Sequence, residues 1–430
     1  MNNSLTIPYN KVDRVEMPRE RLGIAFPSLL LFLILLCTAI QNAIPTIGEV
    51  GPAQLIAIVA LTAAILGKLV RGESLVLTGQ TYLLGLFIGL AALTVPAALW
   101  PGQAFSTLLD ALKIAAIFLL ISNVVTDLRR LSIVVWTICL SGLIPALGTI
   151  KNYLMGVGLV DGFRAAWVGV YANPNDLAYT LAMFMPLALA LASSTRRWSA
   201  RLLALSCMGL YTLAIFLSFS RMGFLCLLFI LIMTLLRSQQ RVRNFLLLLL
   251  LAFCCLPILP ISYWQRTETI TEYDRDHSSL GRLQAWKAGL EMFQEHPLLG
   301  VGAGCYILGW SESTTLETIY RPRSAHNTFF QALAELGLFG FLAFSAFLLV
   351  SWRLLWRLKR ELFEQQCLLS KEIFTARYRR LLAIVIGLDM GFGVFVLSSL
   401  TGGLLFSWFP YIFSALAIAA HTSYQRAKLT

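Results

Sequence analysis

The chain has 430 residues, of which 58% are hydrophobic and 13% are charged, whereas a soluble domain has about 45–50% and about 25%. Such a chain has too little polar surface to coat a water-soluble globule, and many of its apolar runs are long enough to cross a bilayer. The proportions exclude a soluble fold and predict an all-α polytopic membrane protein. The net charge of +12 suggests a nucleic-acid partner only if the basic residues form a patch.

Apolar windows between polar or Gly/Pro-rich connections predict about twelve membrane-spanning helices. No small-residue cleavage site closes the first window, so we expect a retained helix rather than a removed signal peptide. The predicted spans are residues 22–42, 50–70, 75–99, 106–125, 131–150, 177–193, 201–219, 222–236, 244–263, 326–350, 381–400 and 403–420.

Basic residues gather on one side of the predicted bundle. The connections after the first, third and eleventh spans contain no Lys or Arg, whereas those after the second, fourth, sixth, eighth and tenth do. The positive-inside rule therefore predicts that both termini are cytoplasmic. Most of the charge sets the topology, and no nucleic-acid function is expected, because no basic patch is interleaved with stacking aromatics.

Two long extracytoplasmic segments remain, at about 151–176 and 264–325. Loops of this length are usually functional. We therefore divide the chain into helices 1–9 (residues 1–263), a large loop (264–325) and helices 10–12 (326–430).

An amphipathic helix is predicted inside the large loop, because apolar residues recur there at steps of three and four. We expect its apolar face to rest on the membrane domain or the outer-leaflet interface, and Arg282 and Lys287 to project from its polar side. The glycine-rich segment 299–305 that follows is not a GxGxxG pattern and follows no strand, which favours a tight turn over a phosphate site. The apolar positions are Leu283, Trp286, Leu290 and Phe293.

Among the groups on the predicted extracytoplasmic side, three further arginines and one histidine are candidates for a site. Arg321 and Arg323, separated by a proline, are held extended and can face one anionic ligand, and His326 follows at the water boundary of a helix, where a neutral imidazole can accept a proton. Arg221 lies near the apolar region between two spans, where such residues usually serve a site. The alternatives are interfacial anchoring or snorkelling for the arginines and helix capping for His326.

Other candidate groups have weaker patterns. Asn173 or Asp176 is expected to cap the sixth span, and Glu335 or Asp389 is a possible counter-ion of Arg221. The eight cysteines contain no CxxC pair, so no disulfide framework is expected. An Asp-x-Asp pair, Asp274 and Asp276, is a minority metal candidate.

Several short motifs on the same side resemble the O-antigen ligase and polymerase superfamily. They are Asn173–Pro174–Asn175, Ser220–Arg221–x–Gly223, Gly281–Arg282, Ala285–Trp286, Gly289–Leu290, His296–Pro297, Gly300–Val301–Gly302, His326–Asn327 and Gly337–Gly340. The large loop between the ninth and tenth predicted spans resembles the ligases in particular. No arginine of the two long loops has the R-x10-G spacing that is frequent in the polymerases.

The resemblance implies a membrane glycosyltransferase architecture of the GT-C kind. It also implies transfer of a glycan from undecaprenyl diphosphate to a hydroxyl of the lipid A–core oligosaccharide, at the periplasmic face of a Gram-negative inner membrane. Because guanidinium groups can stabilise the leaving diphosphate, we expect the reaction to need no metal or cofactor and to invert the anomeric configuration. We assign the diphosphate clamp to Arg221 and Arg282, and general base catalysis to His326. Substrate binding is assigned to Arg321, Arg323, Asn327, Lys287 and Asn175.

Two kinds of alternative stay open. A polymerase or a protein O-oligosaccharyltransferase of the same superfamily differs in its acceptor. A transporter or flippase of lipid-linked glycans also uses interfacial arginines, but needs no base at His326 and usually shows broken helices in corresponding halves.

Overall fold

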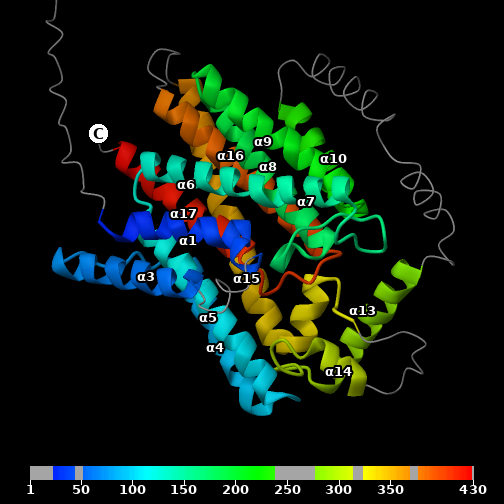
Figure 1. Cartoon of the computed structure of the whole chain (residues 1–430). Coiled ribbons are helices and arrows are strands. Elements are labelled where there is room, and N and C mark those ends of the chain that lie inside the picture. Colours follow the sequence, from blue (N-terminus) through cyan, green and yellow to red (C-terminus); the bar gives the residue numbers. More distant parts are fainter. Residues whose placement is uncertain (1–22, 44–51, 238–276, 313–322, 369–375, 429–430) are drawn as a thin grey trace, which may run out of the picture.

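The computed structural model describes residues 23–43, 52–237, 277–312, 323–368 and 376–428. Apart from one isolated β-bridge between Val160 and Arg164, the regular elements of this part are helical (Figure 1). The α-helices are α1 (Ala25–Thr38), α3 (Pro52–Val70), α4 (Gly79–Thr94), α5 (Pro101–Val124), α6 (Leu128–Ser141), α7 (Leu143–Met155), α8 (Pro174–Ser194), α9 (Trp198–Leu217), α10 (Arg221–Arg237), α13 (His277–Glu295), α14 (Tyr306–Glu312), α15 (Thr328–Leu368), α16 (Ala376–Ser399) and α17 (Phe409–Lys428).

Within these residues, eight helical segments are long and apolar enough to cross a membrane, α6 and α7 counting as one. The prediction of an all-α polytopic membrane protein is confirmed. The predicted count of twelve stays a prediction, because the ninth span, residues 244–263, lies outside the described residues.

Helix α8 is the centre of the bundle. Most of its residues are buried, and it packs against α9, α10 and α16. Gly387 of α16 allows a close approach, because a Cβ there would lie 2.8 Å from the carbonyl oxygen of Pro186 in α8. Close packing against α16 thus fixes α8 inside the bundle.

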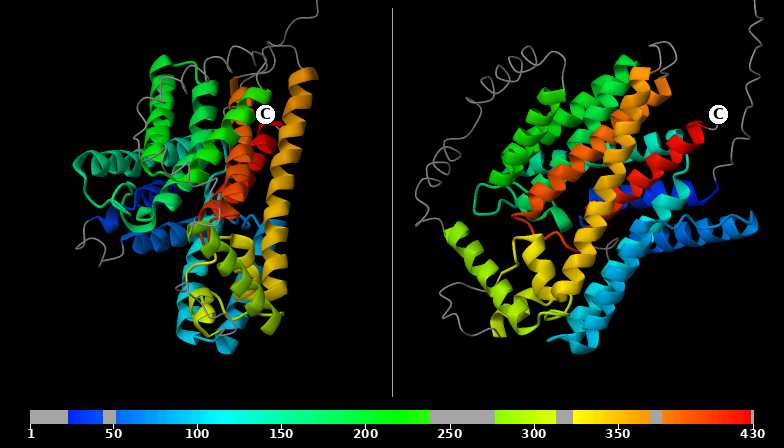
Figure 2. Two further views of the ribbon diagram at one scale, coloured as in Figure 1. Left: turned by 90° about the vertical axis from the view of Figure 1, so that its right-hand side faces the viewer. Right: turned by 180° about the vertical axis from the view of Figure 1, so that it is seen from behind.

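Helix α15 runs through most of the height of the molecule (Figure 2), and it is broken at Gly337 (φ 62°, ψ −163°). The break frees backbone carbonyls, and the glycine-rich turn binds them: the N–H groups of Val301 and Gly302 donate to the carbonyls of Ala334 (2.8 Å) and Glu335 (3.1 Å). The prediction of a tight turn is confirmed, because these N–H groups are occupied within the protein.

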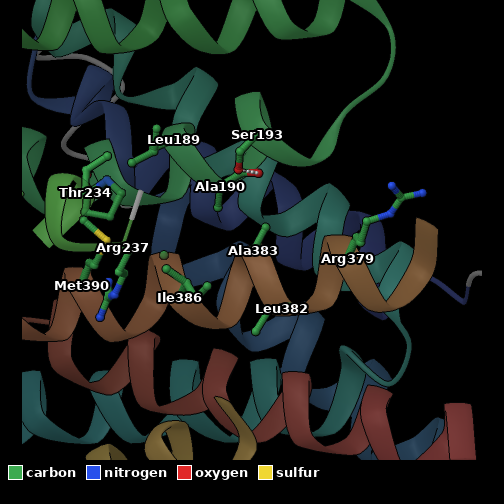
Figure 3. Close-up of a pocket in the computed structure, with 12 residues that line it drawn as sticks. Leu189, Ala190, Ser193, Thr234, Arg237, Arg379, Leu382, Ala383, Ile386 and Met390 are labelled. Carbon is green, nitrogen blue, oxygen red and sulfur yellow. Dashed lines mark hydrogen bonds between the residues drawn. The ribbon is translucent and has the colours of Figure 1, made fainter. Parts of the chain in front are cut away.

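A carboxylate network joins three helices away from this turn. Asp389 of α16 is 7% exposed and accepts from Arg237 of α10 (3.0 Å), Trp352 of α15 (2.9 Å) and Lys359 of α15. Next to it, a cavity of 350 Å³ opens between α8, α10 and α16, and Arg237 and Ser193 are among its lining residues (Figure 3). This cavity lies toward the Ser194 end of α8.

Candidate functional site

His326 lies in the segment that leads into α15, with a left-handed backbone (φ 46°) that costs a non-glycine residue about 1–2 kcal/mol. The next residue, Asn327, is 6% exposed. Its Oδ1 accepts from the backbone N–H of Phe329 (2.9 Å) and Phe330 (3.2 Å), and its Nδ2 donates to the carbonyl of Leu400 (3.3 Å). Asn327, rather than His326, therefore caps α15 and holds the strained residue in place.

Two predicted arginines lie beside this histidine. The guanidinium of Arg323 packs on the backbone of α13, because a Cβ on Gly281 would lie 2.4 Å from its Nη1. Burial, followed by the positive charges of Arg282 and Arg323, lowers the pKa of His326 to about 4. The imidazole is therefore neutral at pH 7, and its Nε2 lies 3.3 Å from Ser324 Oγ.

Arg221 begins α10, and its neighbours explain the Ser–Arg–x–Gly motif. The hydroxyl of Ser220 accepts from the backbone N–H of Gly223 (3.2 Å) and so caps the helix. A Cβ on Gly223 would lie 2.7 Å from Cβ of Ala178 in α8, so the glycine permits close helix packing. Since Ala178 lies within one turn of Asn175, this contact brings the starts of α8 and α10 together.

Asn175 lies in the first turn of α8, and two residues hold it. Asn173 caps the helix, with its Oδ1 accepting from the backbone N–H of Asn175 (2.9 Å), which confirms one of the two predicted caps. Arg164 donates from Nη2 to Asn175 Oδ1 (2.8 Å). The sequence interpretation missed Arg164, although an arginine in a predicted extracytoplasmic loop, against the positive-inside rule, was a signal that could have found it.

Lys287, another predicted ligand, is not gathered with these groups. Lys287 is exposed, and it follows Arg282 by five residues, about 140° around the helix. Arg321 lies outside the described residues.

Both candidate counter-ions of Arg221 have other partners. Asp389 binds the cations described above. Glu335 is 1% exposed, and its carboxylate accepts from the backbone N–H of Gly304 (2.9 Å) and from Gln331 Nε2 (3.2 Å). Glu335 thus stabilises the glycine-rich turn.

The predicted apolar face of α13 packs against the rest of the protein only in part. Leu283 and Leu290 are each 43% exposed, whereas Trp286 stacks on Phe330 of α15 with ring centroids 5.6 Å apart. Small residues let α14 and α15 approach α13 closely, and this packing overrides the three-and-four pattern of large side chains. The packed face consists of Gly281, Ala285, Ala288, Gly289 and Met292.

Metal ligands do not gather in the described part of the chain, where no three His, Cys, Asp or Glu side chains form a group able to hold a metal ion. Asp274 and Asp276 lie outside the described residues.

Cys305 is a buried free thiol at the glycine-rich turn, where its Sγ lies 3.7 Å from the carbonyl oxygen of Trp100.

The site thus combines a neutral imidazole with several guanidinium groups at one end of the bundle. No curated protein matches the sequence. Residues 203–345 match the family model described as O-Antigen ligase, a range that includes Arg221, Arg282 and His326. The match supports the resemblance: over residues 203–345 the chain is similar to the O-antigen ligase family.

Proposed function

We propose that the protein transfers a glycan from undecaprenyl diphosphate to a hydroxyl of the lipid A–core oligosaccharide, at the periplasmic face of a bacterial inner membrane. The observation that carries the proposal is the pair of arginines, Arg282 and Arg323, beside the neutral imidazole of His326. The family match supports glycan transfer of the ligase or polymerase kind.

In this mechanism the arginines bind the donor diphosphate. Guanidinium groups bind phosphate oxygens through charge-assisted, bidentate hydrogen bonds and stabilise the charge that develops on the leaving group. The charges of Arg282 and Arg323 act on His326, which supports their place in the clamp, and we assign Arg221, the first residue of α10, to the same clamp. Arg321, Lys287 and Asn175 are further proposed contacts to the substrates, and Asn327 supports His326.

His326 acts as the general base. Its imidazole takes the proton of the acceptor hydroxyl while the hydroxyl oxygen attacks the anomeric carbon. The bond from that carbon to the phosphate oxygen breaks, undecaprenyl diphosphate leaves, and the configuration inverts. No metal or cofactor takes part in the proposed reaction.

Donor binding also prepares the base. In the free protein, Arg282 and Arg323 disfavour a proton on His326. A bound diphosphate neutralises part of their charge, so the pKa of His326 rises toward its ordinary value of about 6.5. The imidazole therefore becomes a better base once the donor is in place.

The test uses the purified full chain in detergent with undecaprenyl-diphosphate glycan and lipid A–core acceptor. A product with the summed glycan and lipid A–core mass supports the ligase. A longer lipid-linked glycan indicates a polymerase, and a glycosylated protein indicates an O-oligosaccharyltransferase. No product in detergent, together with donor movement across vesicle membranes, indicates a flippase and contradicts the proposal.

A further inference from the structure

Arg164, in the connection between α7 and α8, is a buried cation with no role in the mechanism above. It is 7% exposed. Its Nε donates to the carbonyl oxygen of Ser218 (3.1 Å), and its Nη2 donates to Asn175 Oδ1 (2.8 Å). Nη1 lies 3.6 Å from Asp161 Oδ2, but that carboxylate side chain is 61% exposed. The two buried hydrogen bonds therefore define its main contacts.

These two bonds connect two segments of the site. Ser218 is the C-cap of α9 and comes three residues before Arg221. The last carbonyls of a helix lack an intrahelical donor and carry partial negative charge, so a guanidinium is a favourable partner there. Through one planar group, Arg164 ties the turn that leads to Arg221 to the first turn of α8.

Neighbours of Arg164 hold the same turn. Phe163 meets Phe219 edge to face, with ring centroids 5.2 Å apart at 88°, and the N–H of Ala165 donates to the carbonyl of Leu217 (3.0 Å). Phe219 has a left-handed backbone (φ 50°). The turn before Arg221 is thus strained and is held in that shape from residues 163–165.

Arg282, which we place in the diphosphate clamp, has a small electrostatic effect on Arg164. Burial lowers the pKa of Arg164, Asp161 and Tyr179 oppose this change, and the charge of Arg282 adds a smaller lowering. The Arg164 guanidinium donates its buried hydrogen bonds to Ser218 and Asn175. It therefore acts through these two residues and does not itself bind the donor diphosphate.

We propose that Arg164 is a positioning residue, which fixes Asn175 and the turn before Arg221 so that both meet the donor diphosphate. This inference rests on the proposed function. It assigns a role to the connection between α7 and α8, which lies outside the matched range 203–345.

The experiment measures the dissociation constant of undecaprenyl diphosphate for the purified full chain in detergent, and in parallel the donor KM and kcat of transfer. We expect Arg164→Gln to raise the dissociation constant and the KM about tenfold and to change kcat less than threefold. Arg164→Lys keeps the charge but loses the planar guanidinium, so we expect an intermediate, three- to fivefold increase in the dissociation constant and the KM. Asp161→Asn is the matched control, because it removes only the exposed ion pair, and should stay within twofold of wild type.

A double-mutant cycle separates positioning from general destabilisation. If Arg164 acts through Asn175, Arg164→Gln combined with Asn175→Ala weakens donor binding no more than threefold beyond the worse single variant. The inference is wrong if the effects of the two substitutions multiply, or if both Arg164 variants bind the donor as tightly as wild type. In either case, glycan transfer by the wild-type protein leaves the proposed function standing. A wild-type protein that neither binds undecaprenyl diphosphate nor transfers glycan overturns both.

Discussion

His326 shows how a single residue acquires its chemistry from its surroundings. An exposed histidine is partly protonated near its ordinary pKa of about 6.5. Burial and two neighbouring guanidinium groups lower this pKa to about 4, so the free protein holds an imidazole able to accept a proton at neutral pH. The strained backbone places that imidazole just before the cap of α15.

The pH dependence of transfer tests this electrostatic account. Protonation of His326 abolishes the base, so activity falls as the pH drops through its pKa. We expect the acid limb of kcat/KM, which reports the free protein, near the pKa of about 4, and the acid limb of kcat at a higher pH, because bound diphosphate offsets the arginines.

Arg323→Gln is the matched variant for this profile. Removing that positive charge raises the pKa of His326, so the acid limb of kcat/KM moves upward. The account is contradicted if the acid limb of kcat/KM lies at the same pH in Arg323→Gln as in wild type. It is also contradicted if the acid limb of kcat lies at or below the pH of the kcat/KM limb.

Arg282 is expected to contribute mainly to donor binding. Loss of its charge-assisted hydrogen bonds costs about 1.5–3 kcal/mol, so Arg282→Ala should raise the donor KM about 10- to 100-fold, and Arg282→Lys should recover only part of the loss. Arg360→Ala is the control, because Arg360 is exposed and pairs with Glu364 on the distant half of α15. Equal KM values for Arg282→Ala and the control exclude Arg282 from the clamp.

At the scale of elements, the sequence indicated candidate site residues but not the packing around them. The arginines placed against the positive-inside rule, the glycine-rich turn and the cap at Asn173 could be read from local patterns. The buried face of α13 could not, because glycine and alanine there make close contacts that hydrophobic periodicity does not register. Arg164 was missed for a related reason: its partners, Ser218 and Asn175, are distant in sequence.

The break in α15 requires a glycine at position 337. Gly337 has a backbone conformation that is essentially restricted to glycine, and a Cβ there would lie 2.4 Å from the backbone of Leu298. We expect Gly337→Ala to cost about 1–3 kcal/mol in backbone strain alone and to lower the melting temperature in detergent. Gly85→Ala is the control, because that glycine lies in the exposed face of α4 with open space around it; equal melting temperatures contradict a structural role for the break.

For the whole molecule, the net charge of +12 has two explanations. Most basic residues follow the predicted topology. Of the described arginines that do not follow it, Arg282 and Arg323 act on His326, Arg221 begins α10 and Arg164 holds the first turn of α8. The opposite end of α8 holds a separate network around Asp389, where Arg237 and Lys359 share one carboxylate. The orientation in the membrane and the twelve-span count remain predictions.

The charge arrangement of the whole site predicts transfer without a metal ion. Guanidinium groups stabilise the leaving diphosphate in the proposed mechanism, so full activity should persist in excess EDTA. Loss of activity with the chelator and recovery on adding a divalent cation would favour the pair Asp274 and Asp276 instead.

The central claim is that His326 removes the proton of the acceptor hydroxyl. The most direct measurement is kcat of His326→Ala in the detergent transfer assay, together with its melting temperature and donor affinity. A positioned general base contributes about 10²–10⁴-fold, so we expect kcat to fall by that factor, while folding and donor binding stay close to wild type. Transfer at the wild-type rate by a normally folded His326→Ala protein would contradict the account.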